Sequence, residues 1–377
     1  MIALKETVEL VKKDISGIVR SFETEGFDKV EPKLNSLYER VASENNKWLS
    51  RQGLSSIFVE SIINNTDAER IRKRQTGTRV SLTDGEIEKT VNEMVETIKG
   101  IPYDYEIKFP LSNTVLPEDI QFNTTGISFQ KNKDASGSLS RALKGPAPQS
   151  WLVINASGFL TDTSPGSVYE DALSKFKKIL YLAYLTKSAS FVDPKSYFAT
   201  VKYFNVEILN IKAAKRFSYY LGEPLNKVLS KIQFEDLSTP SFRKQVNEII
   251  SFVSLESDDK KRINLSLEWA FDSLSAGNMT TTFIHKCIAL EALLGDDVAE
   301  SGLTATLSDR CAYLIGRTDS QRKKIRSQFR DLYKMRSKVM HGISRIKAKD
   351  RLVFTASDAL LNELLLKEYL NITKLIP

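Results

Sequence analysis

The stretch that decides the fold of this chain runs from Ser320 to Gly342 and reads SQRKKIRSQFRDLYKMRSKVMHG. Its apolar side chains recur at helical spacing, at Ile325, Phe329, Leu332 and Val339. This period predicts an amphipathic helix over 320–341 that Gly342 terminates. The stripe lacks one member, because its next position is Arg336. An arginine that faces a core is paired or lines a cleft, since burying an unpaired charge is costly.

The two segments before this helix repeat the pattern. Segment 303–316 places Arg310 on its apolar face, and segment 279–295 places Glu291 on its own. Three charged residues therefore occupy inward positions of three adjacent predicted helices. We expect Glu291 to neutralise Arg310 as a structural pair, which leaves Arg336 as the functional candidate.

The rest of the carboxyl-terminal part extends the same helical pattern. Glycines separate six predicted helices, at 241–255, 258–276, 279–295, 303–316, 320–341 and 355–375. The run Ser238-Thr-Pro-Ser241 marks a boundary before them. We therefore expect a helical domain over 241–377.

The first 240 residues have mixed character and form the other predicted region. Residues 1–100 are helical in pattern, 101–162 are strand-rich and 163–240 are mixed. Three strands are predicted, at 103–109, at 120–129 with a turn at Gly126, and at 151–159. Residues 190–235 have an ambiguous pattern, in which 203–209 is a candidate strand. The fold class is thus mainly α, an all-helical bundle preceded by an α+β region with a small antiparallel sheet.

We expect two polar stretches and four aromatic residues of this region to have structural roles. We expect a loop at 131–150, and a solvated helix end at the basic run 70–74. The aromatic residues are expected in the core rather than on a binding surface: Tyr103, Tyr105, Phe122 and Phe129.

Composition narrows the class of protein. The chain has 377 residues, two cysteines and two histidines, which predicts buried thiols in a reducing cytoplasm and no zinc site. No run of 18 apolar residues occurs, and the amino terminus has no apolar core, so neither a membrane span nor a secretory signal is expected. No Gly-rich phosphate loop or acidic cluster with metal-ligand spacing occurs, and we expect no cofactor.

The positive charge is concentrated in one segment. The net charge of the chain is +7, whereas residues 317–351 carry thirteen Lys and Arg against three Asp, a net of +10. A basic segment of this kind points to an anionic partner such as nucleic acid.

His341 lies in this segment, five positions after Arg336. We expect fraying at Gly342 to turn His341 back toward Arg336. An imidazole can exchange a proton with a ribose 2′-hydroxyl or a leaving oxygen, and a guanidinium can hold a phosphate. Such a pair can cleave RNA without a metal, because RNA supplies its own nucleophile. The second histidine, His285, is one step off an apolar face and is expected to be a surface or structural residue.

Three blocks carry a resemblance to a known family. They are Ala289-Leu-Glu-Ala-Leu-Leu, Leu307-Ser-Asp-Arg-Cys-Ala-Tyr-Leu-Ile and Leu332-Tyr-Lys-Met-Arg-Ser-Lys-Val-Met-His-Gly. In this order, over about 240–377, they resemble the HEPN superfamily and its ApeA-like branch. The last block fits the Arg-x4–6-His motif of that superfamily.

The resemblance implies a metal-independent endoribonuclease that acts as a homodimer through the helical domain, with a 2′,3′-cyclic phosphate product. Arg336 would then bind phosphate and His341 would act as acid or base, supported by Glu291 and Arg310. Ser337 follows the arginine, where many active members have Asn, Asp or His, and this difference is expected to affect the catalytic efficiency. The surrounding cations would bind RNA, tRNA included: Arg330, Lys334, Lys338 and Arg345.

The resemblance also implies a biological setting. Bacterial members act in antiphage defence, in abortive infection or as toxins, and a variable partner domain senses the infection. Residues 1–240 would then recognise a phage-derived or antitoxin trigger.

Two other readings remain open. In the first, the helical domain is a non-catalytic module for nucleic-acid binding or dimerisation, and Arg336 has a structural role. Alternatively, the strand-rich part at 101–162 makes the chain a protein–protein adaptor.

Overall fold

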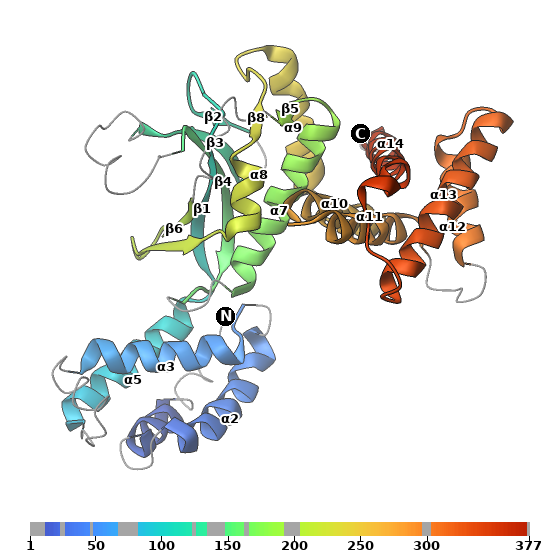
Figure 1. Cartoon of the computed structure of the whole chain (residues 1–377). Helices are drawn as coiled ribbons and strands as arrows, with labels where there is room; N and C mark the ends of the chain where they lie inside the picture. The colour runs from blue at the N-terminus through green and yellow to red at the C-terminus, as the bar shows by residue number, and fades with distance from the viewer. Residues whose placement is uncertain are drawn as a thin grey trace. The chain divides into compact units, whose positions relative to one another are not determined.

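A computed structural model describes most of the chain, with gaps. The described residues are 12–22, 27–45, 48–66, 82–122, 126–133, 148–161, 166–191, 204–295 and 303–374. They fold into two compact units that are interleaved along the sequence (Figure 1). One unit comprises Met1–Ile107, Asn155–Ala172 and Ile208–Phe217, and the other comprises Lys108–Ile154, Leu173–Glu207 and Ser218–Pro377. In these described ranges, no helix has both the length and the apolar character needed to cross a bilayer.

The first unit is built largely on helices, as its sequence predicted. They are residues 12–22, α2 (Phe27–Asn45), α3 (Arg51–Asn65) and α5 (Asp84–Gly100). The predicted capping box of α5 is confirmed, since Thr83 accepts from the Glu86 backbone and Glu86 accepts from the Thr83 backbone. Residues 1–11 and the basic run at 70–74 lie outside the described part of the chain.

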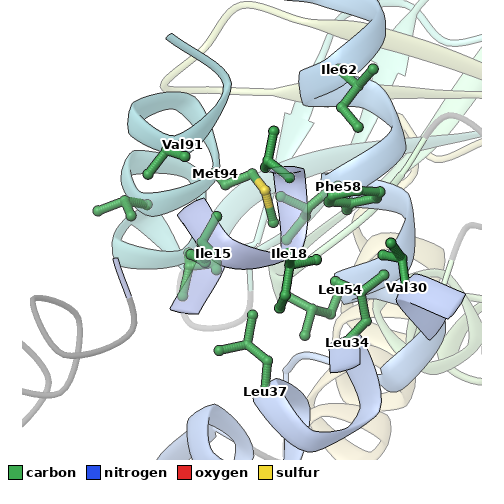
Figure 2. Close-up of a cluster of buried hydrophobic side chains, with 14 of the residues drawn as sticks. Ile15, Ile18, Val30, Leu34, Leu37, Leu54, Phe58, Ile62, Val91 and Met94 are labelled. Carbon is green, nitrogen blue, oxygen red and sulfur yellow. The ribbon is translucent and has the colours of Figure 1, made fainter. Parts of the chain in front are cut away.

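These helices meet in an apolar core because each presents apolar residues at steps of three or four (Figure 2). Leu54, Phe58 and Ile62 of α3 illustrate the spacing. The ring of Phe22 packs edge-on against that of Phe58, with centroids 5.3 Å apart. Buried apolar side chains, rather than ion pairs, therefore hold this unit together.

A six-stranded sheet has the order β2-β3-β4-β1-β6-β7. Its strands are β1 (Tyr103–Leu111), β2 (Ile120–Gln121), β3 (Ile127–Lys131), β4 (Ser150–Gly158), β6 (Asn205–Asn210) and β7 (Arg216–Tyr220). β3 pairs antiparallel with both β2 and β4. The expected core positions of Tyr105, Phe122 and Phe129 are confirmed, and Tyr103 is half-buried.

Short elements account for what the sequence left unassigned between 190 and 235. They are β5 (Ala189–Phe191), which pairs antiparallel with β8 (Ile232–Phe234), the strand β7 and the helix α8 (Glu223–Leu229). Each is at most seven residues long, too short to show a period. Around Gly126 the structure has two short strands, β2 and β3, in place of a single element. Of the predicted loop at 131–150, residues 134–147 lie outside the described residues.

All six predicted carboxyl-terminal helices are confirmed (Figure 1). They are α9 (Pro240–Ser254), α10 (Lys261–Ser275, after the 3-10 turn Asp258–Lys260), α11 (Met279–Leu294), α12 (Leu303–Ile315), α13 (Asp319–Met340) and α14 (Arg351–Thr373). α14 begins four residues earlier than predicted, because a 3-10 turn at Ala348–Asp350 leads directly into it.

The boundary predicted after residue 240 does not separate the two compact units. The helix α7 (Gly166–Leu185) precedes this boundary, yet its second half is bound to the bundle. Lys177 pairs with Asp272 of α10 at 2.7 Å, and the Tyr181 hydroxyl donates to Asn362 of α14 at 2.7 Å. The helical bundle therefore shares its unit with part of the sheet region.

Candidate functional site

The helix α13 has the amphipathic register that the sequence predicted. Thr318 and Gln321 form a capping box at its amino end. Phe329, Leu332 and Tyr333 are buried, and the rings of Phe329 and Tyr333 stack with centroids 4.8 Å apart. The inward face of α13 is therefore fixed by packing, which also fixes the direction of Arg336.

Arg336 lies on this inward face and binds Glu291 of α11 through two nitrogens. Its Nε is 2.6 Å from Glu291 Oε1, and its Nη2 donates to Glu291 Oε2 at 2.9 Å. The Arg336 side chain is 31% exposed and that of Glu291 is 24% exposed. The Nη2 contact is a hydrogen bond and the Nε contact is an ion pair, and together they hold the guanidinium beside the carboxylate. The core-facing register predicted for Arg336 is confirmed.

The partner expected for Glu291 was Arg310, whereas the structure gives this role to Arg336. The Arg310 Nη1 donates to the Leu294 carbonyl at 2.7 Å, at the carboxyl end of α11. A cation at this end of a helix binds a carbonyl without an intrahelical partner and complements the helix dipole. Arg310 thus supports the last turn of α11, the turn that carries Glu291.

The carboxylate of Glu291 also acts on two buried neighbours. Burial, followed by the charge of Glu291, raises the pKa of the Tyr333 hydroxyl and that of the Cys287 thiol. Both groups therefore stay protonated near neutral pH. The Arg336 guanidinium carbon is 5.8 Å from the Tyr333 ring centroid, so an aromatic face adds to its support.

His341 is exposed and caps the carboxyl end of α13. Its backbone N–H donates to the Ser337 carbonyl at 3.0 Å, and Ile343 N–H donates to the Lys338 carbonyl at 2.8 Å. Gly342 has a φ of +70°, and together these features form a Schellman motif. The expected fraying is therefore absent. In helical register, Arg336 and His341 leave the α13 axis about 140° apart, so one chain does not bring them together in the way we expected.

The other predicted RNA contacts lie on the solvent side of α13 and beyond its end. Arg330, Lys334, Lys338 and Arg345 are all exposed, and so is Ser337, which was expected to support the site. The ammonium of Lys334 is 3.6 Å from the carboxylate of Asp331, an exposed pair one turn away. These cations are open to solvent along α13 and just after it.

Sequence reasoning missed a buried charge on α11. Lys286 is 3% exposed, lies 2.5 Å from Asp358 Oδ1 of α14 and sits 3.9 Å above the Phe354 ring. Burial lowers the pKa of Lys286, and Asp358 opposes this shift. The neighbouring His285 is half-buried against the Trp269 ring, with centroids 5.3 Å apart, in keeping with its expected structural role.

Within the described ranges, no group of three or more His, Cys, Asp or Glu side chains is arranged to hold a metal ion. Comparisons of the chain with protein-family models, with curated proteins and with solved structures give no match.

Proposed function

We propose that this chain is a metal-independent endoribonuclease of the HEPN type, an effector of bacterial antiphage defence or abortive infection. The observation that carries the proposal is the state of the two motif residues on α13. Arg336 is oriented by Glu291 on a partly exposed face, and His341 is exposed at the end of the same helix.

The chemistry follows from these two side chains. His341 accepts the proton of a ribose 2′-hydroxyl or supplies one to the leaving 5′-oxygen. Arg336 binds the phosphate and stabilises the charge that develops on it. A guanidinium has five N–H donors, so two-nitrogen contact with Glu291 leaves others to bind a phosphate oxygen.

The active site is proposed to form between two copies of the chain. In helical register, Arg336 and His341 of one chain leave the α13 axis about 140° apart, so a facing second copy is proposed to complete the site. Exposed apolar side chains adjoin His341, since Met340 is 56% and Ile343 is 74% exposed. Apolar surface of this kind favours self-association, and a dimer would bring the motif residues of both copies to one cleft.

The first prediction tests this site directly. The full-length protein is incubated with tRNA or total RNA in EDTA, and the products are resolved on a denaturing gel. We expect cleavage to 2′,3′-cyclic phosphate and 5′-hydroxyl ends by the wild type, and a loss of at least about 100-fold in rate for His341→Ala, the contribution of a general acid or base. The matched control is His285→Gln, which keeps the wild-type rate.

Equal cleavage by the wild type and His341→Ala contradicts the assignment. Because the amino-terminal region is a candidate sensor, the assay is repeated with extract from phage-infected cells. Wild-type protein that stays inactive in both conditions counts against the nuclease.

The second candidate function is a non-catalytic module for nucleic-acid binding or dimerisation. The observation that favours it is the ion pair between Arg336 and Glu291, because this pair by itself explains an arginine at a core-facing position. Salt-dependent RNA binding without cleavage, unchanged in His341→Ala, would support this alternative.

A further inference from the structure

The hairpin of α12 and α13 carries an exposed tyrosine beside two arginines, at the end opposite His341. Three residues, 316–318, join the two helices, which therefore run side by side (Figure 1). Tyr313 of α12 is 63% exposed. The guanidinium carbons of Arg322 and Arg326 on α13 are 4.8 and 5.5 Å from its ring centroid.

Both arginines are anchored in this position by contacts of their own. The Arg326 Nε donates to Asp309 Oδ1 at 2.5 Å, and the Arg322 Nε donates to the Gly316 carbonyl at 3.2 Å. A Cβ at Gly316 would lie 2.7 Å from Arg322 Cγ, so a glycine permits this close passage. Tyr313 thus lies beside two anchored cations, and the residue as a whole is 63% exposed.

A row of cations leads from this ring to His341. The row, called here the basic stripe, consists of Lys323, Arg326, Arg330, Lys334 and Lys338. At 100° per residue, all five lie within about 60° of the direction of His341 on the α13 axis. Four members are exposed and Arg326 is half-buried, so the stripe is open to solvent along the helix.

We propose that the α12–α13 hairpin binds single-stranded RNA, with one base stacked on Tyr313 and the phosphate backbone along the basic stripe to His341. This inference rests on the proposed function, because it supplies the route of the substrate to the same site. An unpaired nucleotide offers both a flat π-face and a phosphate, which are the two groups that an aromatic ring beside arginines recognises. An acidic peptide would match only the charges.

The geometry sets the length of a stacked RNA that would follow the basic stripe. Arg326 and His341 are fifteen residues apart, which is about 22 Å along a helix. At about 3.4 Å per stacked nucleotide, about seven nucleotides reach from Arg326, which lies beside Tyr313, to His341.

The second prediction tests the stacking site by binding rather than by cleavage. Full-length protein carrying His341→Ala is titrated into fluorescein-labelled oligouridylate of 12 nucleotides, and anisotropy reports the affinity. Adding Tyr313→Ala is expected to weaken binding about tenfold, as for the loss of one stacked base. Tyr313→Phe retains the wild-type affinity because it keeps the ring.

Two controls separate stacking from charge. Tyr220→Ala removes a tyrosine of β7 that is 57% exposed, and it should leave the affinity unchanged. Arg330→Gln should reduce the slope of log affinity against log salt by about 0.7, the value for one phosphate contact with a single strand, whereas Tyr313→Ala should leave that slope unchanged.

The results of this binding test can be distinguished from those of the cleavage test. The inference is overturned if the oligonucleotide does not bind, or if adding Tyr313→Ala leaves the affinity of the His341→Ala parent unchanged. Competition by polyglutamate as strong as that by unlabelled RNA would overturn it in favour of an acidic protein partner. If the wild type fails to cleave RNA but Tyr313→Ala still weakens RNA binding tenfold, the RNA-binding site is supported and only the nuclease activity is rejected.

Discussion

The helices at the two ends of the chain are stabilised by different kinds of interaction. The core around Phe58 in the first unit consists of apolar side chains. The helical bundle buries charge as well, with Lys260 and Lys286 at 3% exposure and the half-buried pair of Arg336 and Glu291. Apolar burial stabilises without specifying direction, whereas a buried charge is stable only with a partner in the right place. The buried charges of the bundle therefore mark the positions at which specific groups are held in a fixed orientation.

The largest expected effect on stability is at the partner of Arg336. Glu291→Ala leaves a half-buried guanidinium without its carboxylate and should lower the free energy of unfolding by about 2 kcal/mol. The matched change in the first unit is Glu96→Ala, which removes the exposed pair with Lys99 and should lower it by less than about 0.5 kcal/mol. Urea denaturation measures both.

The double variant Glu291→Leu with Arg336→Leu sharpens this prediction. Replacing both partners by apolar residues should restore most of the loss, because no uncompensated charge remains. Equal stability of Glu291→Ala and Glu96→Ala would remove the contrast between the two regions.

The next effect is a pH dependence that originates from Lys286. Burial lowers its folded-state pKa below the ordinary value of 10.5. Between these two pKa values the unfolded state binds more protons, so the contribution of Lys286 to stability rises as the pH increases toward 10.5. Thermal unfolding is measured for the wild type and Lys286→Met at pH 7 to 10. The stability of the wild type relative to the variant should increase with pH, because the variant has no group to deprotonate at this position. A constant difference across this range would contradict the burial of a charged lysine.

The smallest effect is expected at the end of α13. Gly342 has a φ of +70°, and a Cβ there would meet nothing within 4 Å. Gly342→Ala should therefore lower stability by about 1 kcal/mol through backbone strain alone, and Gly342→Asn by less. The control Gly277→Ala also meets no neighbour and has no positive φ. Similar melting temperatures for Gly342→Ala and Gly277→Ala would contradict the role given to the Schellman motif.

Most of the helical architecture could be predicted from the sequence because helix signals are local. The apolar period of α13, its glycine terminator and the capping pair Thr83 and Glu86 are each contained in a few consecutive residues. Between 189 and 234, β6 matches the strand expected at 203–209. The strands β5, β7 and β8 could not be predicted, since three to five residues carry too little pattern and depend on partners distant in sequence.

The candidate site was predicted in part. The inward register of Arg336 and the cap position of His341 follow from counting along one helix. The pairing of Glu291 with Arg336, the attachment of Arg310 to Leu294 and the burial of Lys286 beside Asp358 depend on how helices pack. We expected Glu291 to pair with Arg310, and no local pattern shows that Arg336 is its partner instead.

The sequence by itself determined where the helices lie and which face of each is apolar, because a period of 3.6 residues is a property of one segment. Only the tertiary structure decided which charges meet, such as Glu291 with Arg336. The physical reason is that an ion pair or a hydrogen bond requires atoms from different segments within about 3 Å of each other, a condition set by packing.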